Sequence, residues 1–196
     1  MAEPGNEFPT KPQWRKQLRA ARRARTAEQW ASEAATLTHT LLNSNVIAEA
    51  RTLGCYLPMP DEPGSVAMLD ALRTAGKRLL LPVVQGEQLD WVAYTGSDAL
   101  TTGAFGLAEP TGERLGTEAL GAAEVVLVPA LAVDRNGTRL GKGKGFYDRA
   151  LRFASSDAVF IVLVRDEELV TRLPAEPHDV TMDWAVTPGR GLIKVG

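Results

Sequence analysis

Short runs of apolar residues recur along the chain, and each of them predicts a β-strand. The runs lie at 52–57, 78–84, 125–133 and 158–164, a partly alternating run lies at 89–94, and a last short one lies at 183–187. Continuous apolar runs of this length are typical of strands that are buried on both faces, as in parallel sheets. The pattern therefore predicts a sheet in the interior of the molecule.

Apolar residues spaced by three and four positions predict helices between and before these strands. Two helices, at 12–25 and 27–43, precede the first strand; Thr10 and Thr26 are placed to cap them. Shorter segments are expected at 66–75, at 146–153 and, as a helix or turn, at 167–173. The strand–helix–strand order predicts an α/β fold, namely a three-layer α/β/α, Rossmann-like, mostly parallel sheet with an N-terminal helical hairpin.

Length and composition fit one ordinary globular domain. The chain has 196 residues, of which 44% are hydrophobic and 23% charged. We expect a flexible N-terminus at 1–10 and a single domain at 11–196. The net charge of -2 gives no overall basic field, so nucleic acid is not an expected partner. No apolar run approaches the roughly 20 residues of a membrane helix, and the first residues lack the apolar core of a signal peptide, so we expect a cytoplasmic protein with no membrane contact. A monomer is also expected.

Cysteine and histidine offer little chemistry. Cys55 is the one cysteine, which excludes an internal disulfide, and its apolar surroundings predict a buried thiol. His39 and His178 are far apart in the sequence and have no zinc-site spacing. A lone histidine such as His39 is more often structural than catalytic.

A glycine- and lysine-rich loop, predicted at 134–145, follows the run at 125–133. Gly141, Gly143 and Gly145 alternate with Lys142 and Lys144. Glycines let the backbone bring its N–H groups close to a ligand, and lysines add positive charge. A phosphate-binding loop and a flexible surface loop with solvated lysines are both compatible with this spacing. The loop matches neither the G-x-x-x-x-G-K-[ST] pattern nor G-x-G-x-x-G.

A basic stripe follows the first predicted helix. Lys11, Arg15, Arg19 and Arg22 recur at helical spacing. Contact with nucleic acid or membrane, contact with a phosphate in a cleft, and a solvated helix face are the three possible interpretations. The residues alone favour the solvated face.

The sequence of residues 139–149, RLGKGKGFYDR, resembles the R-L-G-[RK]-G-x-G-[FY]-Y-D-x signature of the 5-formyltetrahydrofolate cyclo-ligase family. Residues 105–110, FGLAEP, resemble the F-G-[IL]-x-E-P segment of the same family, an architectural match. The family often has Tyr where this chain has Phe146. The resemblance extends from Lys11 to about Asp179.

The resemblance implies a set of site residues. It implies ATP binding by Lys11, Arg15, Arg139, Gly141, Lys142, Gly143, Lys144, Gly145, Phe146 and Tyr147. It implies folate binding by Leu57, Glu62, Lys142, Gly143, Lys144, Gly145 and Phe146, and magnesium contact by Asp148 and Asp179. Lys144 and Arg139 are the expected catalytic residues, and Phe146 and Tyr147 offer flat surfaces to a pterin.

Each carboxylate also has a structural interpretation. Glu62 could also be an exposed carboxylate of a loop. Pro63, the next residue, departs from the Glu-[ILV]-x-[TS] motif that the family often has here. Asp148 has the alternative of stabilising a helix start without any metal. Asp179 has the alternative of a simple loop carboxylate.

The implied reaction is the ATP- and magnesium-dependent cyclisation of 5-formyltetrahydrofolate to 5,10-methenyltetrahydrofolate, with release of ADP and phosphate. The formyl oxygen would be phosphorylated and then displaced by nitrogen-10. Two other functions remain open: a sugar-phosphate-type enzyme of similar fold, and a non-catalytic folate- or nucleotide-binding protein.

Overall fold

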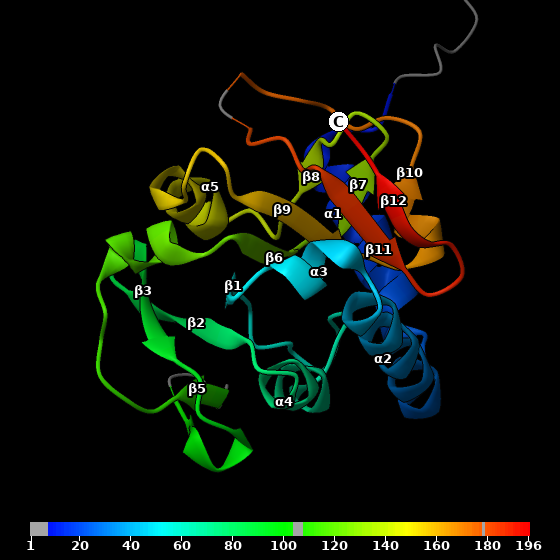
Figure 1. Cartoon of the computed structure of the whole chain (residues 1–196). Helices are drawn as coiled ribbons and strands as arrows, with labels where there is room; N and C mark the ends of the chain where they lie inside the picture. The colour runs from blue at the N-terminus through cyan, green and yellow to red at the C-terminus, as the bar shows by residue number, and fades with distance from the viewer. Residues whose placement is uncertain (1–7, 104–107, 178) are drawn as a thin grey trace, which may run out of the picture.

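The computed structural model describes residues 8–103, 108–177 and 179–196. A seven-stranded sheet with the order β12–β11–β9–β6–β1–β2–β3 runs through it (Figure 1). Its strands are β1 (Thr52–Gly54), β2 (Arg78–Gln85), β3 (Gln88–Ala93), β6 (Val125–Pro129), β9 (Val159–Leu163), β11 (Trp184–Thr187) and β12 (Gly191–Lys194). The edge strands β3 and β12 are antiparallel to their neighbours, whereas the five inner strands are parallel. The expected mostly parallel sheet is confirmed.

The strands form this sheet because both of its faces are apolar. Leu53 of β1 pairs with Leu79 of β2 and with Val125 of β6, and all three belong to one buried cluster. The alternation of side chains sends Leu80 and Val126 to the opposite face, into a second cluster. Two hydrophobic cores therefore lie on the two sides of one sheet.

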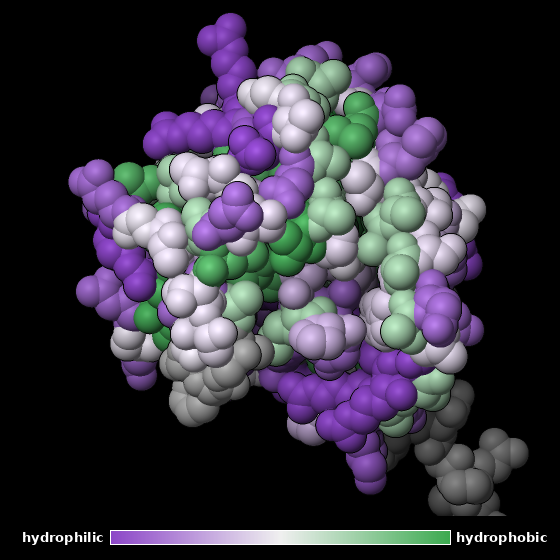
Figure 2. Space-filling view, turned by 90° about the horizontal axis from the view of Figure 1, so that it is seen from below, coloured by the Kyte–Doolittle hydropathy of each residue, from purple (hydrophilic) through white to green (hydrophobic). Residues whose placement is uncertain are grey.

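Helices cover each of these faces, so the expected three layers are confirmed. The first face is covered by α2 (Ala27–Leu42), α3 (Asn45–Glu49) and α4 (Val66–Thr74), and the second by η3 (Thr117–Ala122), α5 (Phe146–Ala150) and η4 (Leu151–Phe153). Figure 1 shows α2 and α4 below the sheet and α5 above it. Seen from the side of α2, α4 and β5 (Ala108–Pro110), hydrophobic residues gather in the middle of the molecular surface and hydrophilic residues surround them (Figure 2).

The N-terminal helices are present, and both begin at a predicted cap. Thr10 caps α1 (Lys11–Arg23), and Thr26 caps α2, each in a capping box with the glutamine three residues later. α2 packs against α4 and the main sheet. α1 instead packs through Leu18 against Leu131 and Leu140, at a small sheet made of β10 (Leu169–Val170), β7 (Ala132–Asp134) and β8 (Arg139–Leu140).

Several element boundaries differ from the sequence prediction. The run at 125–133 is not one strand, because β6 ends at Pro129 and the chain continues into β7 of the small sheet. The expected strand at 52–57 ends at Gly54, and the segment 167–173 contains the short helix η5 (Asp166–Glu168) followed by β10. The sequence did not predict α3, β12, η1 (Ser97–Ala99) or the pair β4 (Leu100–Thr102) and β5 (Ala108–Pro110).

Two further expectations touch residues outside the described ranges. Residues 105–107 of the family-like segment lie outside them, and so does most of the N-terminal segment 1–10. Within the described ranges, no helix combines the length and the apolar character needed to cross a membrane.

Candidate active site

The strand order reverses between β1 and β6. From β1 the chain goes to β2 on one side, whereas from β6 it goes to β9 and β11 on the other side. Such a switch point leaves a crevice beyond the carboxyl ends of the two strands, where open α/β sheets bind ligands. The chain segments that leave these ends are the Glu62 loop, defined as residues 58–65, and the segment leading to the glycine loop, defined as residues 141–145.

A cleft of about 1250 Å³ lies at this place. Every site residue that the family resemblance implies lines it: Lys11, Arg15, Leu57, Glu62, Arg139, Gly141, Lys142, Gly143, Lys144, Gly145, Phe146, Tyr147, Asp148 and Asp179. The structure thus brings together residues from α1, the Glu62 loop, the glycine loop, α5 and the segment before β11. Residues whose place in the cleft the sequence did not indicate include Arg19, Trp30, Met59 and Leu89.

The glycine loop joins β8 to α5 and needs glycine at two positions. Gly143 has φ +103° and Gly145 has φ +70°, a backbone region that is unfavourable for residues with a Cβ. The amides of Gly143, Lys144 and Gly145 make no hydrogen bond with another residue that the structure describes. The loop therefore presents available N–H donors to the cleft.

Arg139 is held firmly at the base of this loop. Its side chain is only 6% exposed. One terminal nitrogen donates to the carbonyl of Pro129 at 3.1 Å, and the other forms an ion pair with Asp148. Asp148 is thus already paired with a cation, and it remains one-third exposed on the cleft side.

Lys144 stands apart from the other cations of the cleft. It is exposed, and its amine makes no hydrogen bond or ion pair with another residue in the described ranges. Its neighbour Arg149 donates to the Lys144 carbonyl at 3.1 Å and to the Glu87 carbonyl at 2.8 Å, which ties the loop backbone to the end of the β2–β3 hairpin.

Three members of the basic stripe of α1 line the cleft and the fourth, Arg22, is buried, so the interpretation of a solvated helix face was wrong. Lys11 pairs with Asp179 at 3.0 Å, the Arg15 Nε donates to the Gly141 carbonyl at 2.9 Å, and Arg19 donates to the Lys142 carbonyl at 3.0 Å. The glycine loop and the segment around Asp179 cover this face of α1. Helical spacing identified the stripe, but it could not show what covers it.

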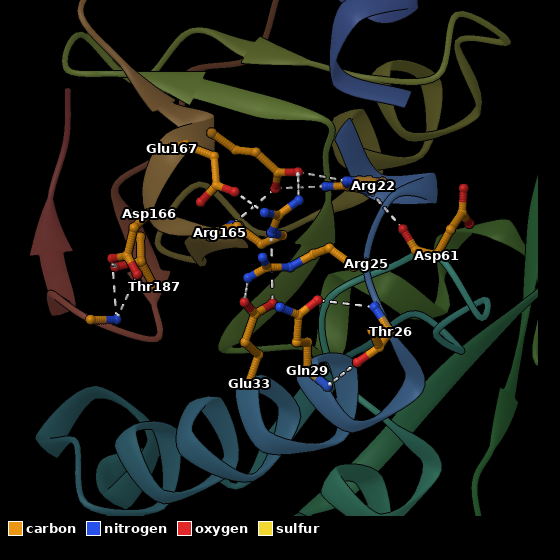
Figure 3. Close-up of polar contacts among 12 residues, drawn as sticks. Arg22, Arg25, Thr26, Gln29, Glu33, Asp61, Arg165, Asp166, Glu167 and Thr187 are labelled. Atoms are coloured by element: carbon orange, nitrogen blue, oxygen red, sulfur yellow. Dashed lines mark hydrogen bonds and ion pairs between the residues drawn. The ribbon is translucent and has the colours of Figure 1, made fainter. Parts of the chain in front are cut away.

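Arg22, the last member of the stripe, is fully buried. Its Nε and one terminal nitrogen donate to the two carboxylate oxygens of Glu168 at 2.7 and 2.8 Å. It also donates to the carbonyls of Ala130 and Asp61, the latter shown in Figure 3. Burial alone would lower the pKa of Arg22, but the hydrogen bonds and charge of Glu168 raise it above its usual value. Nothing in the sequence indicated Glu168 as its partner.

Glu62 is buried at the opposite wall, so the interpretation of an exposed loop carboxylate was also wrong. It is 8% exposed. Its Oε1 pairs with the Lys142 amine at 2.8 Å, and its Oε2 accepts from the Met59 amide at 3.0 Å. An ion pair therefore crosses the cleft from the Glu62 loop to the glycine loop. Pro63 does not disturb this arrangement, because the Tyr56 hydroxyl donates to its carbonyl.

The Tyr147 side chain also lines the cleft, and its hydroxyl is within the influence of the Glu62 charge. It is buried and has no hydrogen-bond partner among the described residues. Burial, and then the nearby charge of Glu62, raise the pKa of Tyr147 well above its usual value, so the phenol is neutral. Phe146 packs beside it, with the guanidinium of Arg149 5.4 Å from its ring centre. A flat polar ligand would meet two aromatic side chains and a hydroxyl donor here.

The two carboxylates implied for magnesium both line the cleft, each beside a positive side chain. Asp148 pairs with Arg139, and Asp179 with Lys11. No cluster of three or more metal-ligating side chains occurs within the described ranges. Magnesium commonly uses one or two carboxylates together with phosphate oxygens and water, so this donor set fits a nucleotide-bound ion. His178 lies outside the described residues.

Comparisons with known proteins agree on one family. The sequence pattern of the 5-formyltetrahydrofolate cyclo-ligase family matches residues 7–188. A 5-formyltetrahydrofolate cyclo-ligase of Mycolicibacterium smegmatis is 47% identical over 156 residues, which cover 76% of this chain and 80% of the relative. One of Escherichia coli K12 is 28% identical over 177 residues, covering 88% and 97%.

Solved structures agree with this result. The NMR structure of 5,10-methenyltetrahydrofolate synthetase from Aquifex aeolicus has a TM-score of 0.80 at 26% identity, covering 94% of this chain and 92% of the other. A synthetase from Mycoplasma pneumoniae has a TM-score of 0.69 at 19% identity, covering 89% and 96%, and supports the fold alone.

Proposed function

Because this chain belongs to the 5-formyltetrahydrofolate cyclo-ligase family, we propose that it cyclises 5-formyltetrahydrofolate to 5,10-methenyltetrahydrofolate. The finer part of the proposal is that the reaction consumes ATP with magnesium and releases ADP and phosphate. The observation that carries it is the cleft at the strand-order reversal, where a basic glycine loop and a buried carboxylate face each other. A phosphate group and a pterin need these two kinds of partner.

The reaction proceeds in two steps. The formyl oxygen attacks the γ-phosphorus of ATP, the bond to the bridging oxygen breaks, and ADP leaves. The resulting imidate phosphate carries a better leaving group than the formamide had. Nitrogen-10 then attacks the formyl carbon and loses its proton, and phosphate departs with the electron pair of the carbon–oxygen bond.

Catalysis of this kind depends on alignment and on neutralising negative charge. Arg139 is rigid because of its two partners, and it supports the loop on which the phosphates lie. Lys144 is the available cation that reaches the transferring phosphoryl group. The glycine-loop amides, which have no partner among the described residues, add donors, and Lys11 and Arg15 extend the positive surface along α1.

The folate binds at the Glu62 side. The Glu62 carboxylate accepts from the amino-pyrimidinone edge of the pterin, where adjacent N–H donors face outward. Leu57 and Phe146 pack against the ring faces, and the buried Tyr147 hydroxyl supplies a donor that lacks a partner in the described structure. Phe146 lacks the hydroxyl of the usual family tyrosine, so this ring contributes packing alone.

Asp148 and Asp179 would hold the magnesium ion at the polyphosphate. Bound there, magnesium neutralises phosphate charge and fixes the geometry of the nucleotide. Each carboxylate is oriented by an ion pair, Asp148 with Arg139 and Asp179 with Lys11, and both line the cleft.

The test follows the near-ultraviolet absorbance of the methenyl product. Protein, 5-formyltetrahydrofolate, ATP and magnesium are mixed, and each component is omitted in turn. We expect an increase that requires all four. ATP binding without any increase would contradict the proposal and would favour the non-catalytic binding protein.

A further inference from the structure

One guanidinium outside the cleft touches the backbone of both cleft walls. Arg22 lies in the last turn of α1, is 1% exposed, and is not part of the cleft lining. It donates to the Ala130 carbonyl at 2.7 Å and to the Asp61 carbonyl at 3.2 Å, while Glu168 receives its other donors. Figure 3 shows its contact with the Asp61 segment.

The two carbonyls belong to chain segments that carry site residues. Asp61 directly precedes Glu62, the carboxylate assigned to the pterin. Ala130 directly follows Pro129, whose own carbonyl accepts from Arg139. The chain after β6 is therefore held at successive carbonyls by Arg22 and Arg139. The Glu62 loop is tied to the same arginine at Asp61.

We propose that Arg22 is a positioning residue that fixes the Glu62 loop relative to the end of β6, and so aligns the folate with the phosphate-binding side. The proposal rests on the proposed function. Glu168 acts through Arg22, because its bidentate contact sets the plane of the guanidinium, and its Oε2 is itself fixed by the Arg165 amide at 2.9 Å. Only a forked side chain can reach this carboxylate and two carbonyls at once.

A purely structural role makes a different prediction. A buried ion pair whose only role is structural should, when weakened, destabilise the whole fold and affect both substrates equally. A positioning role should loosen the Glu62 loop first and impair the folate more than the nucleotide. The two roles can therefore be separated by comparing the two KM values and by measuring backbone exchange locally.

The primary variant is Arg22→Lys, which keeps the charge but removes the fork. We expect the KM for 5-formyltetrahydrofolate to rise about tenfold, as for the loss of a hydrogen bond involving a charged group, with the ATP KM nearly unchanged. Amide hydrogen exchange should accelerate at residues 58–65 and stay slow in β6 and β9. Arg23→Lys is the matched control, because Arg23 is exposed beside it on the same helix and should show neither effect.

A second variant tests the proposal in case Arg22→Lys fails to fold. Arg22→Met combined with Glu168→Leu removes both partners of this ion pair, and the buried Arg165, which also contacts Glu168, keeps Glu33 and Glu167 as partners. The two carbonyls still lose their donor. We expect this double variant to fold and to show the same rise in the folate KM. Unchanged exchange at residues 58–65, or an equal change in both KM values, would overturn the proposal. Unfolding of both variants would overturn it too, because Arg22 would then act on stability alone.

Failure of the proposed function gives a different result. It would appear as absence of turnover in the unmodified protein. The exchange experiment on Arg22→Lys needs no turnover and still decides whether this arginine holds the Glu62 loop.

Discussion

At the scale of single residues, the cations of the cleft differ in what already holds them. Lys11, Lys142 and Arg139 each have a carboxylate partner, whereas the Lys144 amine has none in the described part of the chain. A paired cation orders the site, and its charge is partly satisfied before a ligand arrives. An unpaired and exposed lysine keeps its full charge for the ligand. Lys144 is therefore the side chain most available to an incoming phosphate.

Replacing Lys144 by alanine tests this assignment. We expect Lys144→Ala to leave the melting temperature unchanged, because the amine makes no hydrogen bond or ion pair with described residues, and to reduce kcat/KM for ATP roughly 100-fold, as for other preorganised charge contacts. Steady-state kinetics with ATP varied measures the effect. Lys16→Ala, at an exposed position of α1, is the control. Equal ATP kinetics in the two variants would remove Lys144 from the phosphate site.

In the proposed function, the charge of Glu62 serves the folate directly and the nucleotide only through Lys142. Glu62→Gln keeps an acceptor for the Met59 amide and nearly the same shape, so the loop should stay in place. We expect the affinity for 5-formyltetrahydrofolate to fall about tenfold or more, as when a charged hydrogen-bond partner is lost. ATP binding should not weaken, because the Lys142 amine loses its charged partner at Glu62 and can turn to the phosphates. Calorimetric titration with each ligand separates the two, and a larger loss for ATP would show that the Glu62 loop is not the folate wall.

At the scale of elements, the glycine loop and α1 depend on each other. Arg15 and Arg19 donate to carbonyls of this loop, and a Cβ at Gly143 would lie 3.3 Å from the Arg15 guanidinium carbon. The close approach of the helix is thus possible because residue 143 has no side chain. The same residue has the positive φ that the turn requires.

Gly143→Ala should therefore disturb both the loop and Arg15. We expect a stability loss of about 1–2 kcal/mol from the positive φ and, in addition, a raised KM for ATP. Gly76→Ala is the matched control: Gly76 has φ +85°, a Cβ at this position would meet nothing within 4 Å, and the residue is remote from the cleft lining. It should lose similar stability in thermal unfolding without any change in ATP kinetics. A normal ATP KM in Gly143→Ala would contradict the close-packing argument.

The sequence predicted those helices that are defined by local signals, namely a cap and a helical spacing of apolar residues. Both helix caps and the helix from Val66 were predicted close to their observed places, because caps and helical spacing are local signals. The run at 125–133 was wrongly predicted to be one strand. Apolar continuity reports burial, and Leu131 to Val133 are buried, but in a second small sheet. The passage of the chain from one sheet to another leaves no mark in the hydrophobic pattern, because both strands are buried.

Among the site residues, too, those within a local sequence motif were predicted, whereas pairs formed between distant segments were not. The resemblance of one contiguous signature led to the residues of the glycine loop, all of which line the cleft. Arg22 and Glu168 are separated by 146 positions, and no local pattern joins them. The solvated interpretation of the α1 stripe failed because helical spacing cannot reveal a loop that packs on a helix from elsewhere in the chain.

At the scale of the whole molecule, all three tyrosines of the chain have a raised pKa. Burial is the main cause for Tyr56, Tyr94 and Tyr147; Glu62 adds to it for Tyr56 and Tyr147, and a hydrogen bond donated to Asp70 adds to it for Tyr94. Below about pH 10 the phenols are protonated in both the folded and the unfolded chain, so they give no pH dependence of stability there. Above about pH 10 only the unfolded chain releases their protons, and stability falls as the pH rises.

An alkaline titration tests this prediction. We expect the phenolate absorbance of the native protein to rise only together with the loss of far-ultraviolet circular dichroism. The chain unfolded in guanidinium chloride is the control and should titrate near pH 10, roughly the value for free tyrosine. A tyrosine that ionises near its ordinary pKa while the circular dichroism stays native would contradict the buried placement of that residue.

The ion pair between Lys142 and Glu62 should make the two proposed ligands interdependent. A pterin that takes the Glu62 carboxylate releases the Lys142 amine, which lies on the glycine loop and then turns its charge to the phosphates. Folate binding should thus strengthen nucleotide binding, and thermodynamic reciprocity requires the nucleotide to strengthen folate binding by the same factor. This factor is measured by titrating each ligand in the presence and in the absence of a non-reacting analogue of the other. In the Lys142→Met variant we expect the factor to be close to one.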